Sequence, residues 1–111
     1  MRALDPERFA ALRKDFPGDD LADILRTFAE LTAKTVADVA EGAASRDAAR
    51  TREAAHKLRG GCLAVGALRL ARTAGELEEA TLGGTVDDHA AALAATVQDE
   101  WALLQEDLAS V

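Results

Sequence analysis

The residues best suited to chemistry occupy one short stretch near the middle of the chain, His56-Lys57-Leu58-Arg59-Gly60-Gly61-Cys62. A solvent-exposed imidazole that is neutral near pH 7 is a nucleophile. Arg59, one helical turn from His56, can place a guanidinium beside an anion formed on that ring. Gly60 removes a side chain next to the imidazole and lets another protein approach closely. Together these features suit the transfer of a phosphoryl group onto histidine, in which positioning and neutralisation of charge carry most of the catalysis.

The two adjacent glycines are unfavourable in a segment that otherwise predicts a helix. Glycine inside a helix costs about 1 kcal/mol relative to alanine, so the pair costs about 2 kcal/mol. In a chain so rich in alanine, this cost indicates that the missing side chains matter. We interpret Gly60 as part of a docking surface and Gly61, which lies toward another side of the helix, as a packing residue. Cys62 lies on the apolar stripe and is expected to be a buried, unreactive thiol.

The pattern of apolar residues, caps and helix breakers predicts five helices. Asp5-Pro6-Glu7 is a helix start, with an N-cap followed by proline at the first helical position. Glycines are expected to end the later helices. The expected ranges are a short helix within residues 1–16, then Asp19 or Asp20 to about Glu41 (ended by Gly42), about Ser45 to just before Gly66, about Ala67 to Leu82, and Thr85 to the end of the chain.

Apolar side chains recur every three or four residues in each long segment, as expected for amphipathic helices that share a core. His56, Arg59 and Gly60 lie about 100° around their helix from its apolar stripe, and Arg52 joins them. His56 is therefore expected to face solvent. The predicted core positions are Leu21, Ile24, Leu25, Phe28, Leu31, Thr32, Thr35, Val39, Ala48, Ala55, Leu58, Cys62, Leu70, Ala71, Ala74, Leu77, Leu82, Val86, Ala90, Leu93, Val97, Trp101, Leu104 and Leu108.

Short connections join the four long segments, so neighbouring helices should run antiparallel. The sequence thus predicts an all-α fold, an antiparallel four-helix bundle with a short N-terminal helix. We expect residues 1–111 to form a single domain. Because four long helices are enough to enclose one core, we also expect a monomer.

Composition supports this fold class and limits the partners. Hydrophobic residues make up 49% of the 111 residues and aromatic residues only 4%, and the abundant alanine and leucine favour helices. A net charge of −7 disfavours binding to nucleic acid or to anionic membranes and favours basic or mixed-charge protein partners. Cys62 has no partner for a disulfide, no apolar run approaches the ~20 residues of a membrane span, and the N-terminus lacks a signal core, so we expect a cytoplasmic protein.

The stretch from His56 to Cys62, followed by Gly66 and then Leu77-Glu78, resembles the histidine-containing phosphotransfer (HPt) domain of phosphorelays. That family has histidine, any residue, leucine, lysine, glycine and two small residues, then a further glycine and a Leu-Glu pair in the next helix. The resemblance implies that His56 accepts a phosphoryl group from the aspartate of a receiver domain and passes it to another receiver. It implies a phosphocarrier without kinase activity of its own and without a cofactor, because the receivers supply Mg²⁺. The implied partners are response-regulator receiver domains and a hybrid histidine kinase.

The sequence departs from the family pattern at several positions. Arg59 stands where the family has lysine, which keeps the charge but replaces a point charge with a planar fork. Gly61-Cys62 replaces the usual pair of small hydroxyl residues. Glu78 stands where some members have glutamine, and its carboxylate would either repel the phosphoryl group or face away from it. Arg52 and Lys57 are solvated residues or, with Gly60, contacts for a receiver.

Two other functions remain open from the residues alone. A module that keeps the HPt shape without being phosphorylated would only dock to a receiver or kinase, although an intact His56 argues against it. A metal-binding bundle enzyme would need a Glu-x-x-His pair on each of two helices. Glu53 and His56 form one such pair, but Val86 stands three residues before His89 and there is no second pair. His89 is therefore interpreted as a plain surface residue.

Overall fold

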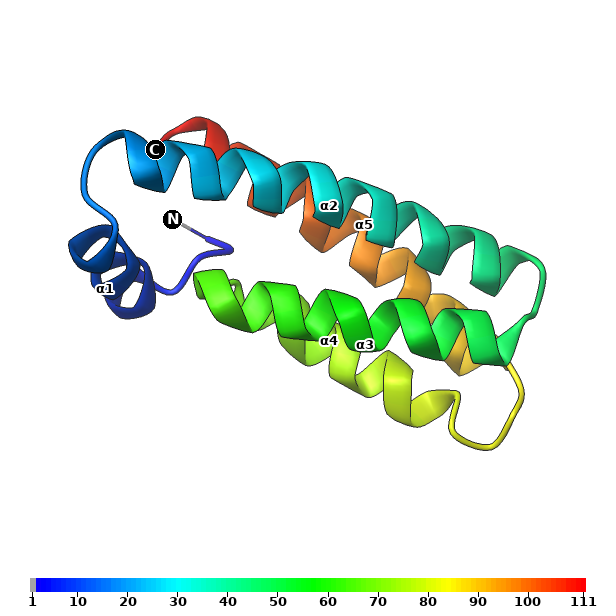
Figure 1. Ribbon diagram of the computed structural model, residues 1–111. Helices are drawn as coiled ribbons and strands as arrows, with labels where there is room; N and C mark the ends of the chain where they lie inside the picture. Colours follow the sequence, from blue (N-terminus) through cyan, green and yellow to red (C-terminus); the bar gives the residue numbers. More distant parts are fainter. Residues whose placement is uncertain (1) are drawn as a thin grey trace.

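The computed structural model describes residues 2–111, and in that part of the chain it contains five helices: α1 (Pro6–Asp15), α2 (Asp19–Ala44), α3 (Ala48–Val65), α4 (Leu68–Ala80) and α5 (Asp88–Ala109). The four long helices form a bundle in which α2 packs on α3, α3 on α4, α4 on α5, and α5 back on α2. Figure 1 shows α1 across the end of this bundle, beside the start of α2. The predicted all-α bundle with a short N-terminal helix is confirmed.

The start of α1 and the C-terminal end of α3 follow the sequence prediction. Asp5 caps α1 by accepting a hydrogen bond from the Arg8 amide at 3.0 Å. α3 ends at Gly66, whose φ of 83° lies in the left-handed region that glycine adopts without strain. The Gly66 carbonyl then accepts a hydrogen bond from the Asp5 amide at 2.8 Å, which ties the start of α1 to the end of α3.

Three predicted boundaries between the later helices are wrong. α2 continues through Gly42 to Ala44. α3 begins at Ala48 rather than near Ser45, and Asp47 caps it by accepting a hydrogen bond from the Arg50 amide at 3.1 Å. α5 begins three residues later than expected, because Asp87 rather than Thr85 caps it. In both starts the aspartate nearest the helix supplies the cap, since an N-cap oxygen must reach the amide of the second or third helical residue.

Most predicted core positions are buried, but Ile24 and Thr35 are only half-buried and two leucines are exposed. Val36, which the predicted stripe left out, is buried instead. Leu58, Leu77 and Leu104 are almost fully buried. Leu31 and Leu82, in contrast, are 63% and 65% exposed. Leu31 lies beside rather than on the buried line of α2, where Thr32 is inward. Leu82 is exposed because α4 ends at Ala80 and the turn that follows no longer continues the helical stripe.

A buried carboxylate joins α4 to α5. Glu100 is only 6% exposed; it accepts a hydrogen bond from the Thr73 hydroxyl and forms an ion pair with the Arg69 guanidinium, whose Nε lies 2.9 Å from Glu100 Oε2. Cys62 is fully buried nearby, and burial, assisted by the charge of Glu100, raises the pKa of its thiol to about 12. The thiol therefore stays protonated and packs as a small hydrophobe, as predicted.

Asp107, near the end of α5, binds the N-terminal segment. Its carboxylate accepts hydrogen bonds from three successive amides, those of Arg2 (3.3 Å), Ala3 (2.6 Å) and Leu4 (3.0 Å). Burial by itself would raise the pKa of Asp107, but these backbone donors outweigh it and lower the pKa below its ordinary value. The ionised carboxylate therefore stabilises the folded chain.

We predict that Asp107→Asn lowers the free energy of unfolding at pH 7 by about 2 kcal/mol, because an amide turns a donor toward backbone donors. A group with a lowered pKa contributes its full stability above its ordinary pKa and loses it as the pH falls through the lowered value. Urea denaturation at a series of pH values should show wild type and Asp107→Asn converging below about pH 4. A stability gap of constant size down to pH 2 would contradict this role.

We also predict opposite effects of alanine at two helical glycines. A Cβ at Gly42 would lie 2.6 Å from Thr51 Oγ1 and 3.0 Å from the Thr51 amide nitrogen, whereas a Cβ at Gly60 would meet nothing within 4 Å. Gly42→Ala should therefore lower the free energy of unfolding by about 1–2 kcal/mol through crowding. Gly60→Ala should raise it by up to about 1 kcal/mol through helix propensity. Denaturant unfolding of both variants checks this, and effects of the same sign would be inconsistent with close contact of α2 and α3 at Gly42.

Candidate functional site

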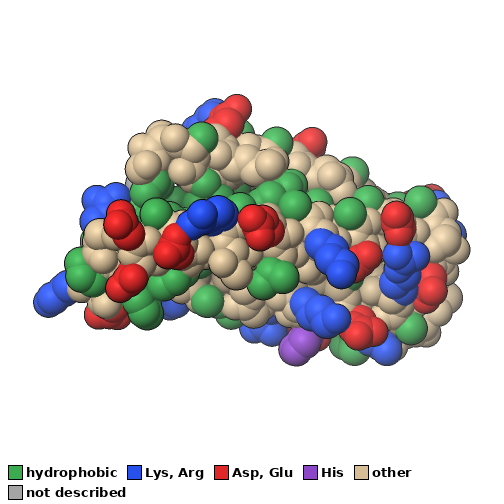
Figure 2. Space-filling model, turned by 45° about the horizontal axis from the view of Figure 1, so that its top comes forward, with side chains coloured by type: hydrophobic (Ala, Val, Ile, Leu, Met, Phe, Trp, Pro, Cys, Tyr) green, Lys and Arg blue, Asp and Glu red, His purple; other side chains and the backbone are tan. Residues whose placement is uncertain are grey.

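His56 projects from the middle of α3, away from the bundle core. Its side chain is 71% exposed, while Ala55 and Leu58 on either side of it are buried. The predicted outward orientation of His56 is thus confirmed. Figure 2 shows a histidine projecting at the lower edge of one face, near Lys and Arg side chains, and away from the hollow that hydrophobic side chains line.

A hydrogen bond from α4 orients the His56 ring. His56 Nδ1 lies 2.9 Å from Glu78 Oε2, and the Glu78 side chain is about three-quarters buried, at 24% exposure. An ionised carboxylate can only accept a hydrogen bond, so we assign the ring proton to Nδ1, which donates a hydrogen bond to Glu78. In the neutral ring the other nitrogen, Nε2, then holds the lone pair and is turned away from Glu78. Glu78 therefore faces the histidine ring rather than away from it.

Arg59 reaches from α3 across to α4. A Cβ built on Gly75 of α4 would lie 3.5 Å from Arg59 Cδ and 3.6 Å from Arg59 Nε, so the arginine stem runs over the bare backbone of Gly75. Arg59, Gly75 and Glu78 line one groove of about 420 Å³ between the two helices. The groove therefore brings the guanidinium to the same side of α3 and α4 as the carboxylate that holds His56.

The two adjacent glycines face different surroundings. Nothing lies within 4 Å of a Cβ built on Gly60, whereas one on Gly61 would meet the Phe28 ring of α2 at 3.9 Å. Gly60 is thus open to solvent, as expected for part of a docking surface, and Gly61 faces α2, as expected for a packing residue. Gly61 also lines a groove of about 290 Å³ between α2 and α3.

Exposed leucines extend the surface around His56, and the sequence analysis did not identify them. Leu63 is 41% exposed and lies seven residues after His56, which returns it to the same face of α3. Leu31, 63% exposed, lines the groove between α2 and α3 together with Lys57. The available signal was helical geometry: positions 56, 60 and 63 share one line along the helix, and position 63 is apolar.

The two basic residues proposed for docking differ in how free they are. Lys57 is 68% exposed and lies 3.7 Å from Glu53, one turn earlier on α3. Arg52 is half-buried and donates a hydrogen bond to the Thr81 carbonyl at 3.5 Å, at the end of α4. Lys57 can therefore turn toward a partner at little cost, whereas Arg52 also supports the end of a helix.

Positive charge is concentrated in α3 and the first half of α4, whereas the second half of α4 carries Glu76, Glu78 and Glu79. Seven of the 13 Lys and Arg residues lie between residues 46 and 75, and this segment contains only two of the 20 acidic residues. Residues 76–111 contain no Lys or Arg. The acidic character of the chain therefore belongs to its other parts. The basic residues of this segment are Arg46, Arg50, Arg52, Lys57, Arg59, Arg69 and Arg72.

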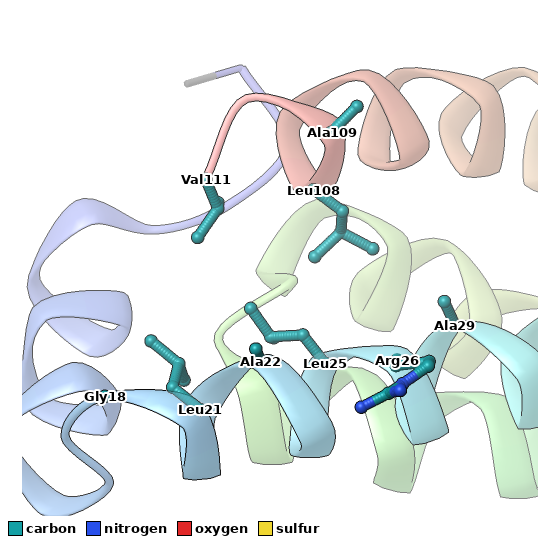
Figure 3. A pocket seen from close by; sticks show the side chains of 9 residues that line it. All are labelled: Gly18, Leu21, Ala22, Leu25, Arg26, Ala29, Leu108, Ala109 and Val111. Carbon is teal, nitrogen blue, oxygen red and sulfur yellow. The ribbon is translucent and has the colours of Figure 1, made fainter.

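A larger groove lies away from this site. It measures about 490 Å³ and is lined by residues from Gly18 to Ala29, at the start of α2, and from Leu108 to Val111, at the end of α5 (Figure 3). Its lining is mostly apolar and includes no residue of α3 or α4. Among residues 2–111, no three His, Cys, Asp or Glu side chains are placed to hold a metal ion. Within the same residues, none of the helices combines the length and hydropathy that a membrane span requires.

Comparisons with known proteins agree with this geometry. The family model described as "Hpt domain" matches residues 23–111, which include His56, Arg59 and Glu78. Among solved structures, the chain is similar to histidine-containing phosphotransfer protein B (HptB) from Pseudomonas aeruginosa PAO1. The TM-score is 0.89 and the sequence identity 27%, over 97% of this chain and 92% of that one. Comparison with curated proteins gives no significant sequence match.

We predict that Glu78 selects the tautomer of His56. In wild type at about pH 8.5, where imidazole is neutral, nitrogen NMR should show Nδ1 protonated and Nε2 unprotonated. Glu78→Ala removes the acceptor and should give a mixture of tautomers, whereas Glu78→Gln keeps a carbonyl acceptor and should largely preserve the wild-type pattern. Glu79→Ala, at the neighbouring exposed carboxylate, is the matched control and should change nothing. An Nε2-protonated ring in wild type would refute this assignment.

Proposed function

The chain belongs to the Hpt domain family, and on that premise we propose that it is a phosphorelay carrier in which His56 accepts a phosphoryl group from a receiver-domain aspartate and passes it to another receiver. The observation that supports this most directly is the exposed imidazole of His56, held through Nδ1 by Glu78 at 2.9 Å. This contact leaves Nε2 as the nucleophile and turns it toward an incoming protein. The source that fits a relay is the receiver domain of a hybrid histidine kinase.

The transfer needs no proton to leave the attacking atom. The Nε2 lone pair attacks the phosphorus of the aspartyl phosphate, the Nε2–P bond forms, and the bond from phosphorus to the aspartate oxygen breaks to release a carboxylate. The ring then carries positive charge, and the Nδ1–H bond to Glu78 places a carboxylate against it. Reversal of the same step returns the phosphoryl group to a second receiver.

Charges around His56 suit this step and its partner. Arg59 supplies a cation for the phosphoryl oxygens. The basic segment between residues 46 and 75 fits a partner whose reactive centre is acidic. Mg²⁺ is expected on the receiver, where it neutralises the transferred group. These residues carry and position a phosphoryl group, and we propose no ATP-dependent kinase activity for the chain itself.

The surface beside His56 is suited to docking. Gly60 leaves the next turn of α3 bare, and Leu63 adds an exposed apolar side chain on the same line. Leu31 provides a second exposed leucine at the groove between α2 and α3. A receiver that covered these side chains would bury apolar surface around the histidine. Its acidic pocket would then face His56 Nε2.

The deciding experiment is label transfer. The purified chain is mixed with a panel of phosphorylated receiver domains and Mg²⁺, and the labelled product is tested for acid lability. We expect acid-labile, alkali-stable label on wild type, none on His56→Gln, and wild-type labelling of His89→Gln, which alters the other histidine. Thermal unfolding of His56→Gln should be close to wild type, because its side chain is exposed.

Two outcomes would overturn this proposal. Binding to a receiver without any label on His56 would favour a module that works only by docking. Label that persists in His56→Gln would place the acceptor elsewhere.

A further inference from the structure

Gly75, on α4, has no role in the family pattern, and it lies in the interior of a helix. A glycine there costs about 1 kcal/mol relative to alanine. Among residues 2–111, and leaving aside its two chain neighbours, a Cβ built at this position would meet only Arg59 within 4 Å, at 3.5 Å (Cδ) and 3.6 Å (Nε). The bare backbone of Gly75 therefore provides the surface on which the Arg59 stem rests.

The Arg59 guanidinium is held in place without being neutralised. None of the ion pairs among residues 2–111 involves Arg59. Of the three carboxylates that line the same groove, Glu78 is engaged by His56, and neither Glu76 nor Glu79 forms an ion pair with Arg59. A cation whose stem is positioned by packing, and whose charge is not satisfied by a neighbour, remains available to an anion.

We infer that Gly75 is a positioning residue for phosphoryl transfer, because it seats Arg59 along the groove between α3 and α4 beside His56. The inference deepens the proposed function and rests on it. The arginine at position 59 requires such a seat more than the family's lysine does, since a guanidinium is broader than an ammonium and is directed by the plane of its fork. Side chains at position 75 larger than a methyl group would occupy the place of the Arg59 stem.

Size at position 75 is the variable to test. Gly75→Ala adds a Cβ at ordinary contact distance from Arg59 and should leave the arginine in place. Gly75→Val adds two γ-methyl groups with a stiff χ1, which should push the Arg59 stem off α4. Both variants lie on a half-exposed helix surface and should fold, which thermal unfolding checks.

The first measurement concerns contact in the unphosphorylated protein. A nuclear Overhauser effect between the Arg59 δ-protons and the Gly75 α-protons is expected in wild type. The corresponding contact with residue 75 is expected in Gly75→Ala, and its loss in Gly75→Val. Because this readout requires no phosphoryl transfer, it tests the seat separately from the proposed function. Absence of the effect in wild type would overturn the inference.

The second measurement is the rate at which His56 is phosphorylated by phosphoramidate, a small donor that needs no receiver. Gly75→Val should react about three- to fivefold more slowly than wild type, the range of an exposed ion pair, while Gly75→Ala should match wild type. In an Arg59→Ala background, Gly75→Val should have no further effect, because the two changes act through one side chain. Equal, additive losses in both backgrounds would show a merely structural role and overturn the inference. No phosphorylation of wild-type His56 with the contact intact would overturn the proposed function and, with it, the role in transfer.

Discussion

The packing of α3 against α4 fixes the geometry of the site. Leu58 and Cys62 from α3 and Leu77 from α4 are buried in the shared core, so the two helices have little freedom to rotate or slide past each other. That seam places Glu78, the neighbour of Leu77, 2.9 Å from His56 Nδ1. It also brings Gly75 under the stem of Arg59. A change that loosened the seam would therefore disturb the tautomer of the histidine and the position of the cation together.

Some glycines of the chain are required by packing within the fold, whereas Gly60 is not. Gly42 and Gly66 are structural, because a Cβ at these positions would lie within 3 Å of Thr51 and Arg8 respectively. Gly60 has open space around it, so its helix cost is not repaid by packing within the chain. A residue that lowers the stability of the fold, and that no packing contact within the protein requires, is expected where another molecule must approach.

Basic and acidic residues are distributed unevenly along the chain. The chain as a whole is acidic, yet the segment between residues 46 and 75 is basic. Acidic residues outside that segment support the fold: Asp87 caps α5, Glu100 joins α4 to α5, and Asp107 binds the N-terminal segment. Asp47, one of the two acidic residues inside the segment, caps α3. Net charge alone described the molecule poorly, because the segment that carries His56 has the opposite sign from the total.

The sequence by itself determined the helical class, the bundle, and the outward orientation of His56. These features depend on local propensity and on the period of the apolar residues, both of which are written along the chain. The same period failed at Leu31 and Leu82, because burial also depends on which side of a helix its neighbours cover and on where the helix ends. Only the tertiary structure decided that Glu78 faces His56, that Gly75 lies under Arg59, and that Asp107 binds the amides of residues 2–4. Those contacts join residues 16 to 105 positions apart, and their geometry is set by how the helices pack, which no local pattern specifies.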